Sequence, residues 1–192
     1  GLNADHQAKY SANRLTVTRQ LPYDPSSSKT VDVGLFLNGI PVATAEIKNH
    51  LTGQTAEDAK RQYRRDRDPR NALLRRAIVH FAVDTEQVFM TTRLSGDSTR
   101  FLPFNRGNGD RAGNPSGDRY RTGYLWEEVW SRDAWLDLLA RFVLTTTDDA
   151  GKKVTLFPRY HQWSAVLSLV ADARSQGAGQ SYLVQHSAGS GK

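Results

Sequence analysis

Apolar and polar residues alternate along two neighbouring segments, residues 31–37 and 40–47, which are separated by Asn38-Gly39. Alternation with a period of two is the pattern of a half-buried β-strand. Asn-Gly favours a tight reversal because both residues tolerate positive φ. The pattern therefore predicts a β-hairpin that extends from about Asp32 to Lys48.

Three charged residues interrupt the alternation: Asp32 on the first strand, and Glu46 and Lys48 on the second. Residues two apart share one face of a strand, so Glu46 and Lys48 should point the same way and Ile47 into the core. A strict two-residue loop would set Asp32 opposite Ala45 and place the two carboxylates on opposite faces. A three-residue loop or a β-bulge restores the parity, so we predict one of these in the hairpin.

Two carboxylates that converge beside a lysine suit a hard divalent cation, because Mg²⁺ prefers oxygen ligands and keeps some of its water. The ammonium group could orient an attacking water or neutralise charge that develops on a phosphate. The alternative is that Asp32, Glu46 and Lys48 are ordinary solvent-facing residues of an amphipathic hairpin. The spacing alone leaves both interpretations open.

A basic helix is predicted after the hairpin, from Thr55 as N-cap to about Arg67, before the break at Asp68-Pro69. Its inward stripe would be formed by Ala56, Ala59 and Tyr63. Its cations could contact DNA phosphates or could simply form a solvated basic face; they are Lys60, Arg61, Arg64, Arg65 and Arg67, and the first four are the DNA-binding candidates.

Further elements follow from the same patterns. Strands are expected over residues 14–21, 77–84 and 87–93, helices over 124–144 and from about Tyr160, and a loop-rich surface connection over 95–123. His80, inside an apolar strand, is expected to be a packed core residue. The later helix would present an apolar stripe made of Trp163, Val166, Leu167 and Val170.

Composition narrows the class of protein. The net charge of +6 is compatible with a partner that carries phosphates. The absence of cysteine excludes disulfides, thiolate zinc sites and a cysteine nucleophile, and suits the cytosol. No apolar run approaches the length of a transmembrane helix, which together with the overall composition indicates a soluble globular protein.

The C-terminal segment has the pattern of a nucleotide-binding loop. A strand is expected over residues 181–185, and "HSAGSGK" then reads as a Walker A loop. Glycines allow backbone N–H groups to cradle phosphates and the lysine would reach them, so the candidate residues are Gly189, Ser190, Gly191 and Lys192. A flexible glycine-rich tail is the alternative. The polar segment 145–153 is expected to be a linker that divides residues 1–146 from residues 147–192, in a chain that we expect to be a fragment.

The stretch "VDVGLFLNGIPVATAEIKN", followed by "LTGQTAEDAKRQYRRDRDP", resembles the nuclease domain of the R subunit of type I restriction enzymes, within the PD-(D/E)xK superfamily. The resemblance implies that Asp32, Glu46 and Lys48 are the catalytic acid, acid and lysine, with the carbonyl of Ile47 as a further metal ligand. Val31 stands where the usual proline would be. The Gln-xxx-Tyr motif of related nucleases is not met as written, and Gln62 or Tyr63 would act in its place.

Two later motifs extend the resemblance. "FPRYHQ" resembles the Q-tip element of superfamily 2 helicases, which implies that Gln162 hydrogen-bonds the adenine of ATP. Similar restriction subunits also carry histidine at the first position of "HSAGSGK". The implied fold is α/β: a PD-(D/E)xK core with a mixed sheet flanked by helices, followed by the first elements of a RecA-like motor.

The implied activity is Mg²⁺-dependent cleavage of double-stranded DNA by an ATP-dependent type I restriction enzyme, in the cytoplasm of a bacterium or archaeon. The implied partners are the methylation and specificity subunits, and no membrane. The fragment alone is not expected to hydrolyse ATP. One alternative is a nuclease-fold DNA-binding module of a P-loop translocase without cleavage activity, and another is a DNA repair helicase-nuclease.

Overall fold

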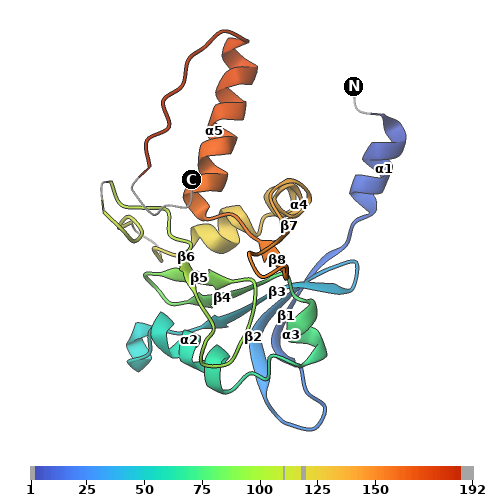
Figure 1. Ribbon diagram of the computed structural model, residues 1–192, viewed down its shortest axis with the longest axis vertical. Helices are drawn as coiled ribbons and strands as arrows, with labels where there is room; N and C mark the ends of the chain where they lie inside the picture. Colours follow the sequence, from blue (N-terminus) through green and yellow to red (C-terminus); the bar gives the residue numbers. More distant parts are fainter. Residues whose placement is uncertain (1–2, 110, 118–119, 187–192) are drawn as a thin grey trace.

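The computed structural model describes residues 3–109, 111–117 and 120–186. Its centre is a six-stranded sheet in the order β1-β2-β3-β4-β5-β6, with helices on both sides (Figure 1). The strands are β1 (Leu15–Pro22), β2 (Thr30–Leu37), β3 (Ile40–Ile47), β4 (Val79–Val83), β5 (Val88–Thr91) and β6 (Leu102–Pro103). This confirms the expected mixed sheet flanked by helices.

One strand pair, β3 with β4, is parallel, and the other neighbours in the sheet are antiparallel. A parallel pair needs a crossover connection, and here the crossover carries three helices. They are the 3₁₀ turn η1 (His50–Thr52), α2 (Ala56–Arg65) and the short α3 (Ala72–Arg76). Because α2 packs on β3 and β4, it covers the part of the sheet that holds Glu46.

The β2–β3 hairpin contains the predicted bulge. Asn38 and Gly39 form a two-residue turn with φ of 53° and 82°, and Leu37 pairs with Ile40. Phe36 then pairs with Pro41 but Leu35 pairs with Ala43, which leaves Val42 as the extra residue on β3. The register therefore shifts by one, Val33 pairs with Ala45, and the next step sets Asp32 opposite Glu46.

Two hydrophobic clusters lie on opposite faces of the sheet. Phe81 belongs to the larger one, whose other side is formed by η2 (Leu125–Val129) and α4 (Arg132–Arg141). Its ring packs against those of Phe104, Trp135 and Phe157. Ala82, the next residue on β4, belongs to the smaller cluster beneath α2. Figure 1 accordingly shows α2 and α4 on opposite sides of the sheet.

The smaller cluster contains a chain of buried polar groups. The Thr44 hydroxyl lies 2.8 Å from the Tyr63 hydroxyl and 2.7 Å from Nδ1 of His80. Burial lowers the pKa of His80 to about 4, so this imidazole is neutral near pH 7. The expectation that His80 is a packed, hydrogen-bonded core residue is confirmed.

Two departures from the expected elements lie between residues 124 and 156. The helix expected over residues 124–144 is interrupted at Trp130 and Ser131, between η2 and α4. The expected linker is instead a β-hairpin of β7 (Leu144–Thr147) and β8 (Lys153–Leu156), which gives its backbone the ladder partners that an open linker lacks. The residues after it, Phe157, Tyr160 and Trp163, join the larger cluster. The division of the chain into two domains stays a prediction.

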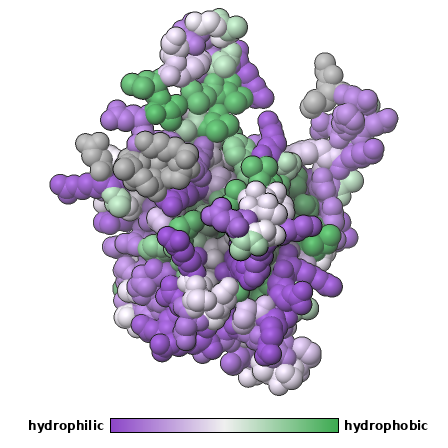
Figure 2. All heavy atoms as spheres, in the orientation of Figure 1, coloured by the Kyte–Doolittle hydropathy of each residue, from purple (hydrophilic) through white to green (hydrophobic). Residues whose placement is uncertain are grey.

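Helix α5 (Tyr160–Gln176) begins where predicted, but its apolar stripe is only partly buried. Trp163 is buried, whereas Val166, Leu167 and Val170 are 42%, 39% and 37% exposed. Figure 1 shows α5 projecting away from the sheet, and Figure 2 shows apolar residues gathered on this projecting part.

The strand expected over residues 181–185 is absent. A strand needs a hydrogen-bonded neighbour, and none of the strands in the described part of the chain pairs with this segment. Leu183 is accordingly 92% exposed.

No helix among the described residues is long and apolar enough to cross a membrane.

Replacing His80 with glutamine should make stability less sensitive to acid. The folded protein keeps His80 neutral down to about pH 4, whereas the unfolded chain binds a proton near pH 6.5. Since the unfolded state binds more protons between these values, the free energy of unfolding falls as the pH is lowered through that window. The depressed pKa corresponds to on the order of 3 kcal/mol. Denaturant unfolding at pH 7 and pH 4 should therefore show a smaller loss for His80→Gln than for wild type; equal losses would contradict a neutral buried imidazole.

Candidate active site

Asp32 stands where β2 and β3 separate. Backbone pairing of the two strands ends at Val33 and Ala45, and beyond it Oδ2 of Asp32 accepts the backbone N–H of Ile47 at 2.8 Å. Its Oδ1 accepts a hydrogen bond from the side-chain amide of Gln20, on β1, at 3.1 Å. The Asp32 carboxylate is therefore held from the two neighbouring strands.

Glu46 is fully buried and only one of its carboxylate oxygens is satisfied. Oε1 accepts Nε–H of Arg67 at 2.7 Å and lies 2.7 Å from a terminal nitrogen of the same guanidinium. Oε2 has no hydrogen-bond partner in the described part of the chain. Buried polar atoms in native proteins are nearly always paired, so an unpaired carboxylate oxygen beside Asp32 marks a position for a ligand.

The pKa of Glu46 responds to the charges of the other two predicted residues, Asp32 and Lys48. Burial raises the pKa of the Glu46 carboxyl to about 7, and the hydrogen bond and positive charge of Arg67 oppose this rise. Smaller contributions come from Asp32, whose negative charge raises the pKa, and from Lys48, whose positive charge lowers it. The backbone N–H of Lys48 donates to the carbonyl of Val83 at 2.8 Å, which fixes the end of β3 against β4.

The side chain of Ile47 does not point into the core as expected. It is 41% exposed, because the larger hydrophobic cluster ends on this strand at Ala45. This correction concerns only the side chain. The predicted metal ligand is the backbone carbonyl of Ile47, between Glu46 and Lys48, and it does not depend on the direction of the side chain.

These donors fit a magnesium-like cation. The described residues contain no cluster of three or more His, Cys, Asp or Glu that could hold a metal by itself. Mg²⁺ is usually bound through one or two carboxylates, and water and substrate phosphates complete its shell. Asp32, Oε2 of Glu46 and the carbonyl of Ile47 could supply such a partial set, and Oε2 has no other partner among the described residues.

The cationic side chains of α2 differ in their exposure and in the groups that they contact. Lys60 is buried: it forms an ion pair with Glu57, and its Nζ lies 3.8 Å from the centroid of the Phe89 ring. The expectation that Lys60 lies on an exposed basic face is therefore wrong. Its aliphatic stem covers apolar surface instead. Arg64 is half-buried and donates Nε–H to the carbonyl of Thr99 at 3.2 Å.

The two remaining cations of α2 point outward. Arg61 and Arg65 have side chains that are 60% and 68% exposed. Arg61 pairs with Asp58 at 2.6 Å, and Arg65 lies 3.5 Å from Asp97. Surface pairs of this kind are weak and exchange readily with other anions. The predicted role in binding DNA therefore rests on Arg61 and Arg65 more than on Lys60.

The residues expected to replace the Gln-xxx-Tyr motif lie on different sides of α2. Tyr63 is buried in the smaller cluster, where its hydroxyl contacts Thr44. Burial raises its pKa well above the ordinary value, so it stays a neutral packing residue. Gln62 is half-buried, and its catalytic role stays a prediction.

The predicted nucleotide-binding residues are only partly within the described chain. The side-chain oxygen of Gln162 accepts the backbone N–H of Arg159 at 2.9 Å, which satisfies a free donor at the start of α5. Its contact with adenine stays a prediction. Gly189, Ser190, Gly191 and Lys192 lie outside the described residues.

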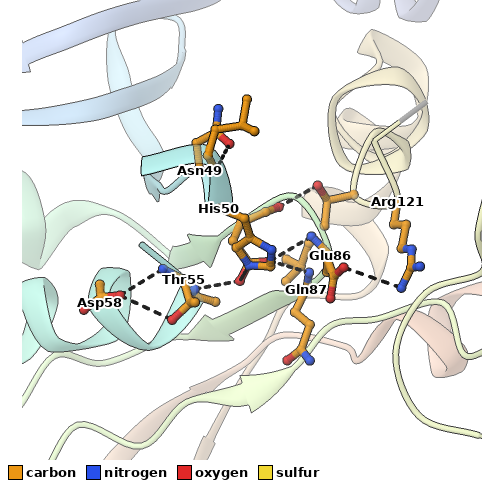
Figure 3. Close-up of polar contacts among 12 residues, drawn as sticks. Asn49, His50, Thr55, Asp58, Glu86, Gln87 and Arg121 are labelled. Carbon is orange, nitrogen blue, oxygen red and sulfur yellow. Dashed lines mark hydrogen bonds and ion pairs between the residues drawn. The ribbon is translucent and has the colours of Figure 1, made fainter. Parts of the chain in front are cut away.

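Asp84 is an anchor that sequence reasoning missed. One carboxylate oxygen lies 3.0 Å from Nε2 of His50 and accepts the backbone N–H of Ala56 at 2.8 Å, and the other accepts the N–H groups of Glu86 and Gln87. Figure 3 shows His50, Glu86 and Gln87 converging, beside the capping contact of Thr55 with Asp58. Burial alone would raise the pKa of Asp84, but these hydrogen bonds lower it overall. Asp84 thus fixes the segment between Lys48 and α2.

Residues 4–99 match the family described as "Type I restriction enzyme R protein N terminus". The chain is also 27% identical, over 94% of its length, to a protein of Methanocaldococcus jannaschii that is provisionally named type I restriction enzyme MjaVIIIP endonuclease subunit. The family match covers half of the chain, including the hairpin, α2 and the Asp84 anchor.

The described fold is of the mixed α/β class, and the family match identifies its N-terminal half as a domain of a restriction-enzyme subunit. The chain belongs to the family of type I restriction enzyme R protein N-terminal regions. It spans 17% of the length of the curated relative that it matches.

Replacing Asp84 with alanine should destabilise the fold by roughly 3 kcal/mol, because several donors lose a charged acceptor at once. The matched control is Asp97→Ala: its side chain is 81% exposed and its one ion pair is long. The control should cost less than about 0.5 kcal/mol. Denaturant unfolding of both variants measures the difference, and equal effects would show that Asp84 is not an anchor.

Proposed function

We propose that this domain is the metal-dependent DNA endonuclease of a type I restriction enzyme R subunit. The observation that carries the proposal is that Oε2 of buried Glu46 has no hydrogen-bond partner in the described part of the chain. The Val42 bulge brings Glu46 to the same face as Asp32, within electrostatic reach of Lys48. An ordinary amphipathic hairpin has no reason to bury an acid with a free oxygen. The PD-(D/E)xK class fits this arrangement.

The proposed chemistry is hydrolysis of a phosphodiester bond. Asp32, Oε2 of Glu46 and the carbonyl of Ile47 would hold Mg²⁺, which when bound lowers the pKa of water and offsets charge on the phosphate. Gln20 holds Oδ1 of Asp32 and the backbone N–H of Ile47 holds Oδ2, so the carboxylate keeps a fixed orientation. Lys48 would orient the attacking water or stabilise the negative charge that develops at the phosphate.

Double-stranded DNA would approach along the exposed cations of α2. The outward side chains of Arg61 and Arg65, together with the net charge of +6, supply attraction to a phosphate backbone. Gln62 lies on the same helix and is a candidate to support the catalytic lysine. These contacts position DNA without reading its sequence.

The activity of the whole enzyme extends beyond this domain. By the family relationship, we propose that the complete protein uses ATP to move DNA and works with methylation and specificity subunits. Gln162, Gly189, Ser190, Gly191 and Lys192 would contribute to that nucleotide site. The main alternative is a DNA-binding module that keeps the nuclease fold but does not cut.

Lys48→Ala in the full-length protein, assembled with its partner subunits, separates these alternatives. Loss of a positioned catalytic group should slow DNA cleavage by roughly 100-fold or more and leave ATP hydrolysis unchanged. Lys152→Ala, in the exposed turn of the β7–β8 hairpin, is the matched control and should affect neither reaction. If cleavage by Lys48→Ala equals that of the control, the hairpin is structural and the endonuclease proposal is wrong.

Arg65→Ala and Lys60→Met should have different effects on DNA binding. Arg65 is exposed, so its loss should weaken affinity and reduce the salt dependence of binding by about one phosphate contact. Lys60 is buried against Phe89, so its loss should lower stability by about 1 kcal/mol and leave DNA affinity unchanged. Fluorescence anisotropy across a salt series tests both. Weaker binding by Lys60→Met than by Arg65→Ala would contradict the assignment.

A further inference from the structure

We propose that Arg67 is a positioning residue of the metal site: it holds Oε1 of Glu46 and so directs Oε2 to the cation. This inference rests on the proposed endonuclease function. Arg67 follows α2 by two residues and, at 4% side-chain exposure, is nearly as buried as the acid that it contacts.

The guanidinium is fixed from several directions. Its Nε and one terminal nitrogen both lie 2.7 Å from Oε1 of Glu46. The same terminal nitrogen donates to the carbonyl of Thr30 at 2.7 Å, two residues before Asp32. The centroid of the Tyr23 ring lies 5.2 Å from the guanidinium carbon, and the Tyr23 hydroxyl donates to the carbonyl of Asp66. Arg67 therefore connects the strands that carry the two acids.

This arrangement would divide the Glu46 carboxylate between Arg67, at Oε1, and the proposed cation, at Oε2. A buried carboxylate without a partner is strongly disfavoured, and Arg67 supplies the compensating charge while it uses one oxygen only. With Oε1 occupied, Glu46 can offer the cation a single oxygen. Monodentate coordination agrees with the near-octahedral geometry that Mg²⁺ demands.

Lysine could not reproduce these contacts. The planar guanidinium places its donors in a fixed fork, so it can contact Glu46 and Thr30 at the same time. An ammonium on a flexible stem keeps the charge but loses this fixed geometry. The conservative variant Arg67→Lys therefore separates the positioning of Glu46 from charge compensation alone.

The test measures Mn²⁺ binding by electron paramagnetic resonance and the Mn²⁺ dependence of DNA cleavage in the full-length protein. The Mn²⁺ that wild type binds and Asp32→Asn does not is taken as the ion at the proposed metal site. At that site Arg67→Lys should lower affinity by roughly 10- to 100-fold, the usual effect of losing a group that orients a metal ligand. Arg67→Met should lower it further. Excess Mn²⁺ should restore part of the cleavage by Arg67→Lys.

The matched control is Arg106→Lys. Arg106 also pairs with a glutamate, Glu128 at 3.1 Å, and lies over the ring of Tyr124, but its partner is on η2 and not on the β2–β3 hairpin. It should leave Mn²⁺ binding and cleavage unchanged. Circular dichroism tests whether each variant is folded. If Arg67→Met does not fold, the result for Arg67→Lys alone decides whether Arg67 positions Glu46.

The outcomes separate this inference from the proposed function. If Asp32→Asn removes Mn²⁺ binding but a folded Arg67→Lys matches wild type in affinity and cleavage, Arg67 only supports the fold and the inference is overturned. If Asp32→Asn displaces no Mn²⁺ and leaves cleavage intact, the endonuclease site itself is wrong. A shift in Mn²⁺ affinity by Arg67→Lys, absent in Arg106→Lys, supports the positioning role.

Discussion

The face of the sheet on which Glu46 stands depends on one extra residue in β3. In an antiparallel pair every change of register by one residue exchanges the two faces. Val42 makes that change between the Asn38-Gly39 turn and the acids, so Asp32 and Glu46 meet. The same parity leaves Ala43 and Ala45 facing the larger hydrophobic cluster. The site and the core therefore depend on a single bulge.

The charges of the site are stabilised by groups far away in the chain. Glu46 is buried at the cost of desolvation, which Arg67 offsets from the segment after α2. That segment is in turn held by its contact with Thr30, while Asp84 secures the opposite end of α2 through the N–H of Ala56. The crossover between β3 and β4 thus acts as a frame around the acids. These contacts suit the proposed metal site, whose oxygen ligands must be held in fixed positions.

Local patterns were sufficient for the elements that depend on local chemistry. Alternation and Asn-Gly predicted the hairpin, the demand that two acids share a face predicted the bulge, and helical spacing placed Tyr63 inward. Contacts between distant segments were not predictable: Arg67 reads as one more cation of a basic helix, and Asp84 as the end of a strand. Lys60 was misplaced because spacing does not show that Phe89 lies beneath it. The strand expected over residues 181–185 does not form, because no described strand lies beside it, and a local pattern cannot show this.

A crystal structure of the protein grown with Mn²⁺, with anomalous scattering measured at the manganese edge, tests the central claim most directly. The account predicts one anomalous peak between the carboxylate of Asp32 and Oε2 of Glu46, next to the carbonyl of Ile47, with Arg67 still bound to Oε1. A peak elsewhere, with Glu46 still paired only to Arg67, would contradict the claim that the Val42 bulge brings the two acids together to hold a metal ion.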